Sequence, residues 1–105
     1  MPYDPTPLSR DAVKTLREIA RDLESGKAEY DGPRSAARVL RDLHELVEHL
    51  PQILLQTSAA MDRMARDRDD ATTVARFIGE AATTATNLTD QLRKAHEAAE
   101  EVRAR

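Results

Sequence analysis

The strongest constraint on the fold is a heptad repeat that occurs twice in the chain. In residues 36–64, and again in residues 74–102, apolar or small side chains recur at alternating intervals of four and three. This spacing keeps one stripe of a helix facing a partner helix, as in a coiled coil. The first repeat consists of Ala36, Leu40, Leu43, Val47, Leu50, Leu54, Thr57, Met61 and Met64, and the second of Val74, Ile78, Ala81, Ala85, Leu88, Leu92, Ala95, Ala99 and Val102.

The two repeats are separated only by a short charged segment, residues 66–70. Helices joined by a short loop are antiparallel neighbours, so the sequence predicts a long, coiled-coil-like helical hairpin. With a short amphipathic helix before it, the predicted fold class is all-α, a three-helix bundle. We expect residues 1–8 to form a flexible proline-rich arm and residues 9–105 a single helical domain, with helices at about 9–25, 33–66 and 70–104.

Capping residues and prolines predict where these helices begin and end. Ser9 is a candidate N-cap, Gly26 a helix stop, and Pro33 a typical first helical residue. Pro51 lies inside the second helix and interrupts its hydrogen bonds, yet the heptad phase continues through it unchanged. We therefore predict one helix kinked at Pro51. The alternative is a chain that turns at Pro51 and forms four shorter helices.

The composition narrows the possible functions. A net charge of −3 argues against a nucleic-acid clamp, which usually carries a basic excess. The chain has no cysteine and therefore no disulfide or thiol chemistry. We see neither a signal peptide nor a transmembrane segment, so we expect a cytoplasmic protein. Arginine outnumbers lysine and alanine is abundant, which is typical of a high-GC bacterial genome.

The two flanks of the predicted seam differ in side-chain size. One flank is too apolar for water, and there we expect the first helix to dock; it consists of Val39, Leu46, Ile53 and Ala60, facing Phe77, Thr84, Gln91 and Ala98. The other flank is built mostly from small residues that allow another helix to approach, namely Ala37, His44, Pro51, Ser58 and Ala65, with Ala75, Ala82, Thr89 and His96.

These flanks predict a non-enzymatic module for protein–protein interaction, either a homodimer or a subunit that binds another helical protein, in a regulatory or assembly role. We expect no catalytic residue, cofactor, metal or membrane partner, and nucleic acid is an unfavoured partner. The arginines at the start of the second helix either orient the partner or neutralise the acidic residues Glu97, Glu100 and Glu101. The predicted interface residues are Ala37, His44, Leu55, Ala82 and Thr89, with Arg34, Arg38 and Arg41 as the orienting charges.

Two alternatives remain open from the residues. The paired carboxylates Glu45 with Glu48 and Glu97 with Glu100 are similar to the acidic motifs of all-helical, metal-dependent nucleotide pyrophosphohydrolases. In the heptad phase all four side chains point outward, which disfavours a shared metal ion. The second alternative is a weak nucleic-acid-binding accessory protein, whose binding would fall steeply with salt.

Overall fold

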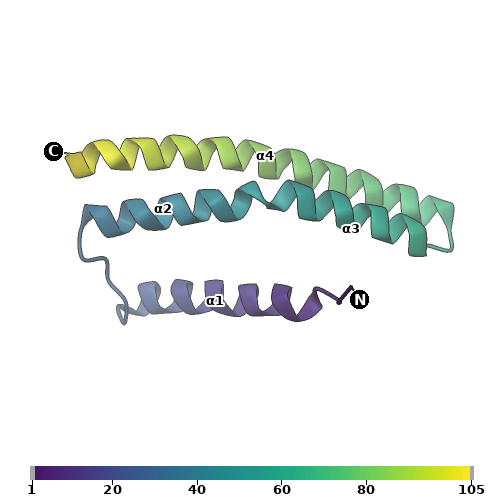
Figure 1. The fold of residues 1–105 in the computed structure, drawn as a ribbon, viewed down its shortest axis with the longest axis horizontal. Helices are drawn as coiled ribbons and strands as arrows, with labels where there is room; N and C mark the ends of the chain where they lie inside the picture. Colours follow the sequence, from purple (N-terminus) through teal and green to yellow (C-terminus); the bar gives the residue numbers. More distant parts are fainter. Residues whose placement is uncertain (1, 105) are drawn as a thin grey trace. The chain divides into compact units, whose positions relative to one another are not determined.

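The computed structural model describes residues 2–104 as four α-helices, and the side chains of residues 2–102 (Figure 1). No strand is found in the described residues, so the predicted all-α class is confirmed. The chain divides into two compact units, of which the first ends at Asp31 and the second begins at Gly32. The helices are α1 (Thr6–Ser25), α2 (Pro33–Glu48), α3 (Leu50–Met64) and α4 (Arg68–Ala104).

Helix α1 begins at Thr6, three residues before the predicted cap. Proline is tolerated in a first turn, where the backbone N–H groups have no intrahelical partner, so Pro7 does not delay the helix. The Ser9 hydroxyl donates to the carbonyl of Thr6 at 2.9 Å and caps nothing. The prediction for Ser9 was therefore wrong, and residues 6–8 are helical. The stop at Gly26 is confirmed, because this glycine adopts a left-handed φ of 81°.

The apolar stripe of α1 has nothing to pack against within its own unit. None of the residues of this helix is buried. The predicted docking of this helix on the flank that contains Val39, Leu46, Ile53 and Ala60 stays a prediction. The large side chains of the stripe are between 37% and 56% exposed, and they are Leu8, Val13, Leu16, Ile19 and Leu23.

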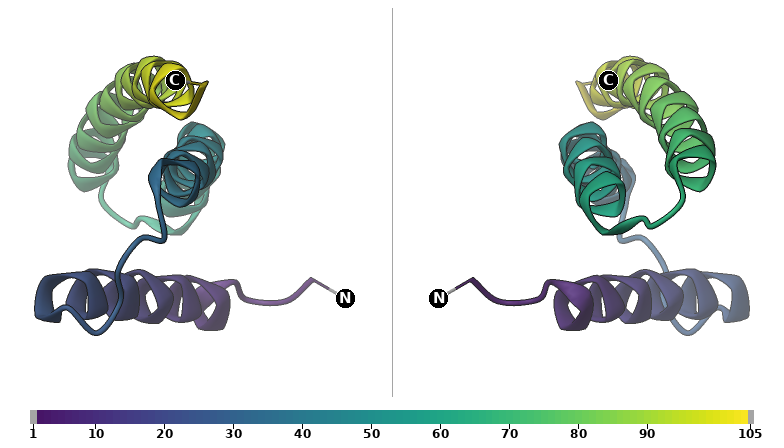
Figure 2. Two further views of the ribbon diagram at one scale, coloured as in Figure 1. Left: turned by 90° about the vertical axis from the view of Figure 1, so that its left-hand side faces the viewer. Right: turned by 90° about the vertical axis from the view of Figure 1, so that its right-hand side faces the viewer.

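The second unit is the predicted antiparallel hairpin. Helices α2 and α3 follow one another along the length of α4 (Figure 1). Seen end-on, α2 and α3 overlie each other beside α4 (Figure 2). Helix α4 has 37 residues, which corresponds to a rod about 55 Å long at 1.5 Å per residue.

The chain breaks its helical hydrogen bonding at His49 but keeps its direction. Pro51 lies in the first turn of α3 and has no N–H to donate to the carbonyl of Val47. The N–H of His49 bonds the Leu46 carbonyl at 3.3 Å, and the N–H of Ile53 bonds the His49 carbonyl at 3.2 Å. His49 stays right-handed helical, with φ −85° and ψ −13°. The chain therefore passes Pro51 as an interrupted helix and does not reverse there.

The hairpin turn is held by two charged side chains. Asp67 is the N-cap of α4, because its Oδ1 accepts a hydrogen bond from the N–H of Asp69 at 2.7 Å. The Arg68 guanidinium reaches back and donates to the carbonyls of Asp62 at 2.9 Å and Ala65 at 3.1 Å. Carbonyls at the end of α3 thus gain a cationic donor, which also suits the helix dipole.

The stripe of each helix that packs inside the hairpin differs from the predicted seam. Among the described residues only five are buried, namely Ala37, Val47, Ala71, Ala82 and Ala85. Seven members of the predicted seam are exposed instead: Thr57, Met61, Met64, Ala81, Leu88, Ala95 and Val102. We call the observed buried and half-buried rows the inner seam, and they are Ala37, Leu40, His44, Val47, Pro51, Leu54 and Ser58 on α2–α3, and Ala71, Val74, Ile78, Ala82, Ala85, Thr89, Leu92, His96 and Ala99 on α4.

The helices are rotated about their axes relative to the predicted seam, and this rotation has a packing reason. Rows that are displaced by one heptad position, about 50° around the helix, have the same four-three spacing, so spacing alone does not fix the phase. Small residues let two helices approach closely. The hairpin therefore packs the row that contains Ala37, Ala82 and Ala85 inside, and it leaves larger side chains, such as Ile53 and Phe77, on its surface.

Candidate functional site

The structure separates the predicted interface residues into two groups. Ala37 and Ala82 are 1% and 8% exposed, and His44 and Thr89 are half-buried. All four belong to the inner seam, so the expectation that they face outward was wrong. Leu55 is 54% exposed and projects from the hairpin as expected. The three arginines Arg34, Arg38 and Arg41 are also exposed.

The ion pairs that the structure describes for Arg41 and Glu97 each lie within one helix. Arg41 pairs with its neighbour Asp42 at 3.5 Å, and Glu97 pairs on its own helix with Arg93 at 2.9 Å. None of the ion pairs that the structure describes joins Arg34 or Arg38 to α4.

A second pair of heptad rows lies on the surface of the hairpin, and we call it the outer apolar face. On α2–α3 it includes Leu46 and Ile53, which are 38% and 56% exposed, and on α4 it includes Phe77 and Leu88, which are 57% and 41% exposed. Sequence reasoning had identified one row of this face as too apolar for water. The full rows are Ala36, Val39, Leu43, Leu46, Leu50, Ile53, Thr57, Ala60 and Met64 on α2–α3, of which Ala36, Val39, Leu43, Leu50 and Ala60 are half-buried, and Phe77, Ala81, Thr84, Leu88, Gln91, Ala95, Ala98 and Val102 on α4.

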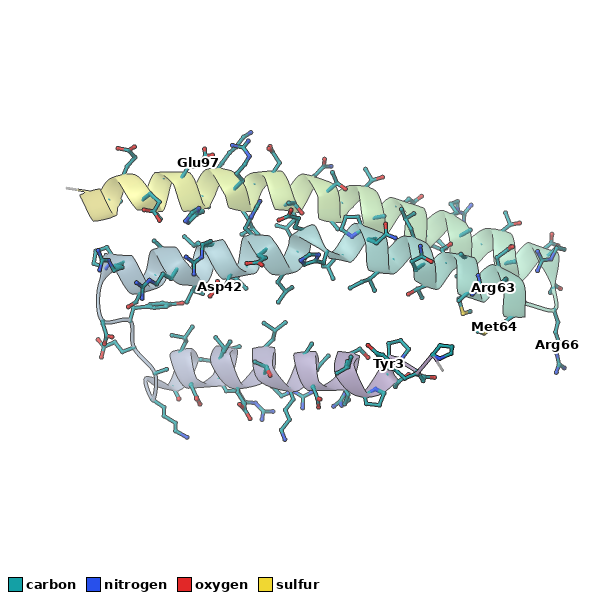
Figure 3. The ribbon with its side chains drawn as sticks, in the orientation of Figure 1. Tyr3, Asp42, Arg63, Met64, Arg66 and Glu97 are labelled. Atoms are coloured by element: carbon teal, nitrogen blue, oxygen red, sulfur yellow. The ribbon has the colours of Figure 1, made fainter. Side chains whose placement is uncertain are left out.

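Both rows of the outer apolar face lie on the same side of the hairpin. On each helix the centre of the outer apolar face lies about 100° around the axis from the centre of the inner seam. The sense of this displacement along the chain direction is the same on both helices. The two helices are antiparallel, so the same displacement brings both rows to one side. Asp42 on α2 and Glu97 on α4 mark the opposite outer edges of the hairpin, and Arg63, Met64 and Arg66 mark its turn end (Figure 3).

The other side of the hairpin carries an open groove next to the helix break. Its volume is about 340 Å³. The Thr86 and Thr89 hydroxyls donate to carbonyls of their own helix at 3.1 and 2.8 Å, so they are not free nucleophiles. His44 Nδ1 lies 3.9 Å from Glu48 Oε2. The groove is lined by His44, Glu48 and Pro51 from α2–α3 and by Thr86, Thr89, Asp90 and Arg93 from α4.

The carboxyl of Asp90 in the groove has a lowered pKa. Hydrogen bonds from Arg93 at 2.7 Å and from Lys94 at 3.2 Å hold the pKa of its carboxyl below the ordinary 3.8. Because the folded pKa is the lower one, this contribution to stability is present above about pH 4 and is lost as the pH falls through the folded pKa. We expect Arg93→Gln to raise the pKa of Asp90 toward 3.8, as measured by NMR titration of the carboxyl carbon. Arg41→Gln is the matched control, and an unchanged pKa in Arg93→Gln would contradict the assignment.

The four carboxylates on which the alternative enzymatic hypothesis depends do not form a metal-binding cluster in the described residues. Glu45, Glu48 and Glu97 are exposed, and Glu100 accepts from His96 Nε2 at 3.1 Å on its own helix. Within the part of the chain that the structure describes, no group of three or more histidine or acidic side chains could hold a metal ion.

Comparison with known proteins adds no relative. No family model matches the chain, and neither the curated proteins nor the solved structures yield a significant match. Among the described helices, none combines the length and the apolar character needed to cross a bilayer.

Proposed function

We propose that the protein is a helical interaction module whose outer apolar face binds other α-helices. The observation that carries this proposal is the exposure of large apolar side chains, Leu46, Ile53, Phe77 and Leu88, on one side of the hairpin. Large apolar side chains gathered on one surface are characteristic of interaction sites. Their four-three spacing fits a helix better than a strand or a loop, because this spacing is the one that helical knobs and holes require.

The chain's own first helix is too short to account for the whole face. Helix α1 has 20 residues, which corresponds to about 30 Å, whereas α4 is about 55 Å long. Even a docked α1 would leave a considerable part of the face without cover. The exposed remainder is what a partner protein would bury.

Site-specific photo-crosslinking in the cells of origin tests this function. A photoreactive amino acid at position 53 should form adducts with a second polypeptide, because Ile53 lies on the outer apolar face. The same amino acid at position 55 is a matched control, since Ile53 and Leu55 are 56% and 54% exposed on one helix but point to different sides. Intermolecular adducts at position 53 and not at 55 are expected. Crosslinks confined to the chain itself, or equal adducts at both positions, would contradict the proposal.

A further inference from the structure

We propose that the partner on the outer apolar face is a second copy of this chain, and that two hairpins form a four-helix bundle with their turns at the same end. This inference rests on the proposed function and names its partner. It is carried by three features of the hairpin: the angle between its two seams, the sizes of the side chains in the outer rows, and the charges along the rim.

The angle between the seams matches a bundle of four helices. In such a bundle each helix has two neighbours at about 90° from one another, whereas in a three-helix bundle the angle is about 60°. On both α2–α3 and α4 the outer apolar face lies about 100° from the inner seam. The face therefore fits a pair of additional helices better than one helix in the groove. A second hairpin supplies such a pair.

The predicted heptad seam supports the same arrangement. On each helix it shares one row with the inner seam and one row with the outer apolar face, so its centre lies between them, in the direction of the centre of a four-helix bundle. Leu43 and Leu50 on α2–α3 are half-buried, and Leu88 on α4 is 41% exposed. A helix of a four-helix bundle buries this central stripe together with a flank on either side. A single hairpin leaves the stripe half covered, and a second hairpin would complete it.

The outer rows of α2–α3 and α4 complement each other in size. Ile53 is eleven residues before the end of α3, and Ala81 is thirteen residues after the start of α4, so the two lie at a similar height. Likewise Phe77, nine residues after the start of α4, is level with Thr57, seven residues before the end of α3. When α2–α3 of one copy lies against α4 of the other, large side chains thus meet small ones, as interdigitated packing requires.

The charged residues beside the outer rows favour a dimer in which the turns of both hairpins lie at the same end. Asp42 on α2 and Lys94 on α4 flank the outer rows, and their side chains are 65% and 67% exposed. With the two turns together, Asp42 of one copy comes within about one helical turn of Lys94 of the other, an attractive pair. With the turns at opposite ends, two-fold symmetry would instead place α2–α3 of one copy against α2–α3 of the other, so Asp42 would lose this partner.

Light scattering behind a sizing column, on the purified full chain over a range of concentrations, tests the pairing. We expect twice the chain mass of 11.7 kDa. Ile53→Glu should weaken the dimer by at least tenfold, and Leu55→Glu, at an equally exposed position, should leave it unchanged. Circular dichroism should show equal helix content in both variants, because neither side chain is buried in the hairpin.

A charge exchange tests the orientation. Asp42→Lys and Lys94→Asp should each weaken the dimer several-fold, and the double variant should recover most of the loss. Failure of the double variant to recover would overturn the arrangement with both turns at one end.

A wild-type monomer at every concentration would overturn self-pairing. The photo-crosslink at position 53 then shows whether a different protein or α1 of the same chain covers the outer apolar face. Adducts with a different protein would leave the proposed interaction function standing, whereas crosslinks only to α1 of the same chain would overturn the function as well.

Discussion

Replacing Val47 with aspartate is expected to lower the free energy of unfolding by about 3 kcal/mol. Val47 is 7% exposed and lies in the inner seam. The substitution removes an apolar side chain from the contact between α2 and α4 and places a carboxylate there without a partner. Urea or thermal denaturation followed by circular dichroism measures the loss.

Leu55→Asp is the control for this variant, because it introduces the same charge at a side chain that is 54% exposed. It should change the stability by less than about 1 kcal/mol. Equal losses in the two variants would show that Val47 is not part of a packed seam.

Enlarging Ala82 to leucine is expected to destabilise the hairpin by about 2 kcal/mol, because a close-packed contact has no room for the added carbons. Ala82 is 8% exposed and lies one helical turn from the equally buried Ala85. Ala59→Leu is the matched control on an exposed position of α3, where added carbons meet only solvent. Chemical denaturation of both variants gives the comparison.

If Ala82→Leu left the stability unchanged and altered only the mass in solution, Ala82 would belong to an interface between copies. That result would restore the orientation expected from the sequence. It would contradict the inner seam described here.

Local backbone chemistry made the end of α1 and the start of α2 predictable. Gly26 ends α1 and Pro33 starts α2 because a left-handed C-terminal residue and a proline at the first helical position each have a direct physical cause. The start of α1 was missed because Ser9 was read as the cap. The three prolines before it are no obstacle in the first turn or ahead of it. The hydrogen bonds from Arg68 to carbonyls at the end of α3 leave no periodic signal in the sequence.

The phase of the seam was not predictable from spacing. Leucines were assigned to the contact because their rows continue the four-three spacing without a break. Spacing says nothing of the distance between the helices, which alanines shorten. The rows that contain Ala37 and Ala82 therefore pack inside, and they had been assigned to an interface between proteins.

The apolar character of the surface was partly predictable. Ile53 and Phe77 were correctly placed on a flank too apolar for water, and both are more than half exposed. Leu88 was assigned to the seam and is instead part of the outer apolar face. The groove beside Pro51 was not predicted, because it arises from the break in α2–α3 and from side chains that are distant in the sequence.

A distance between the turns of two copies tests the proposed bundle most directly. The chain has no cysteine, so Arg66→Cys provides a single attachment site for a spin label at the turn end. Pulsed electron paramagnetic resonance on the labelled full chain should give an intermolecular distance of about 20–30 Å, since neighbouring helices lie about 10 Å apart and the label adds to this. A distance near the hairpin length of about 55 Å, or no dipolar coupling at all, would contradict two hairpins paired with their turns together.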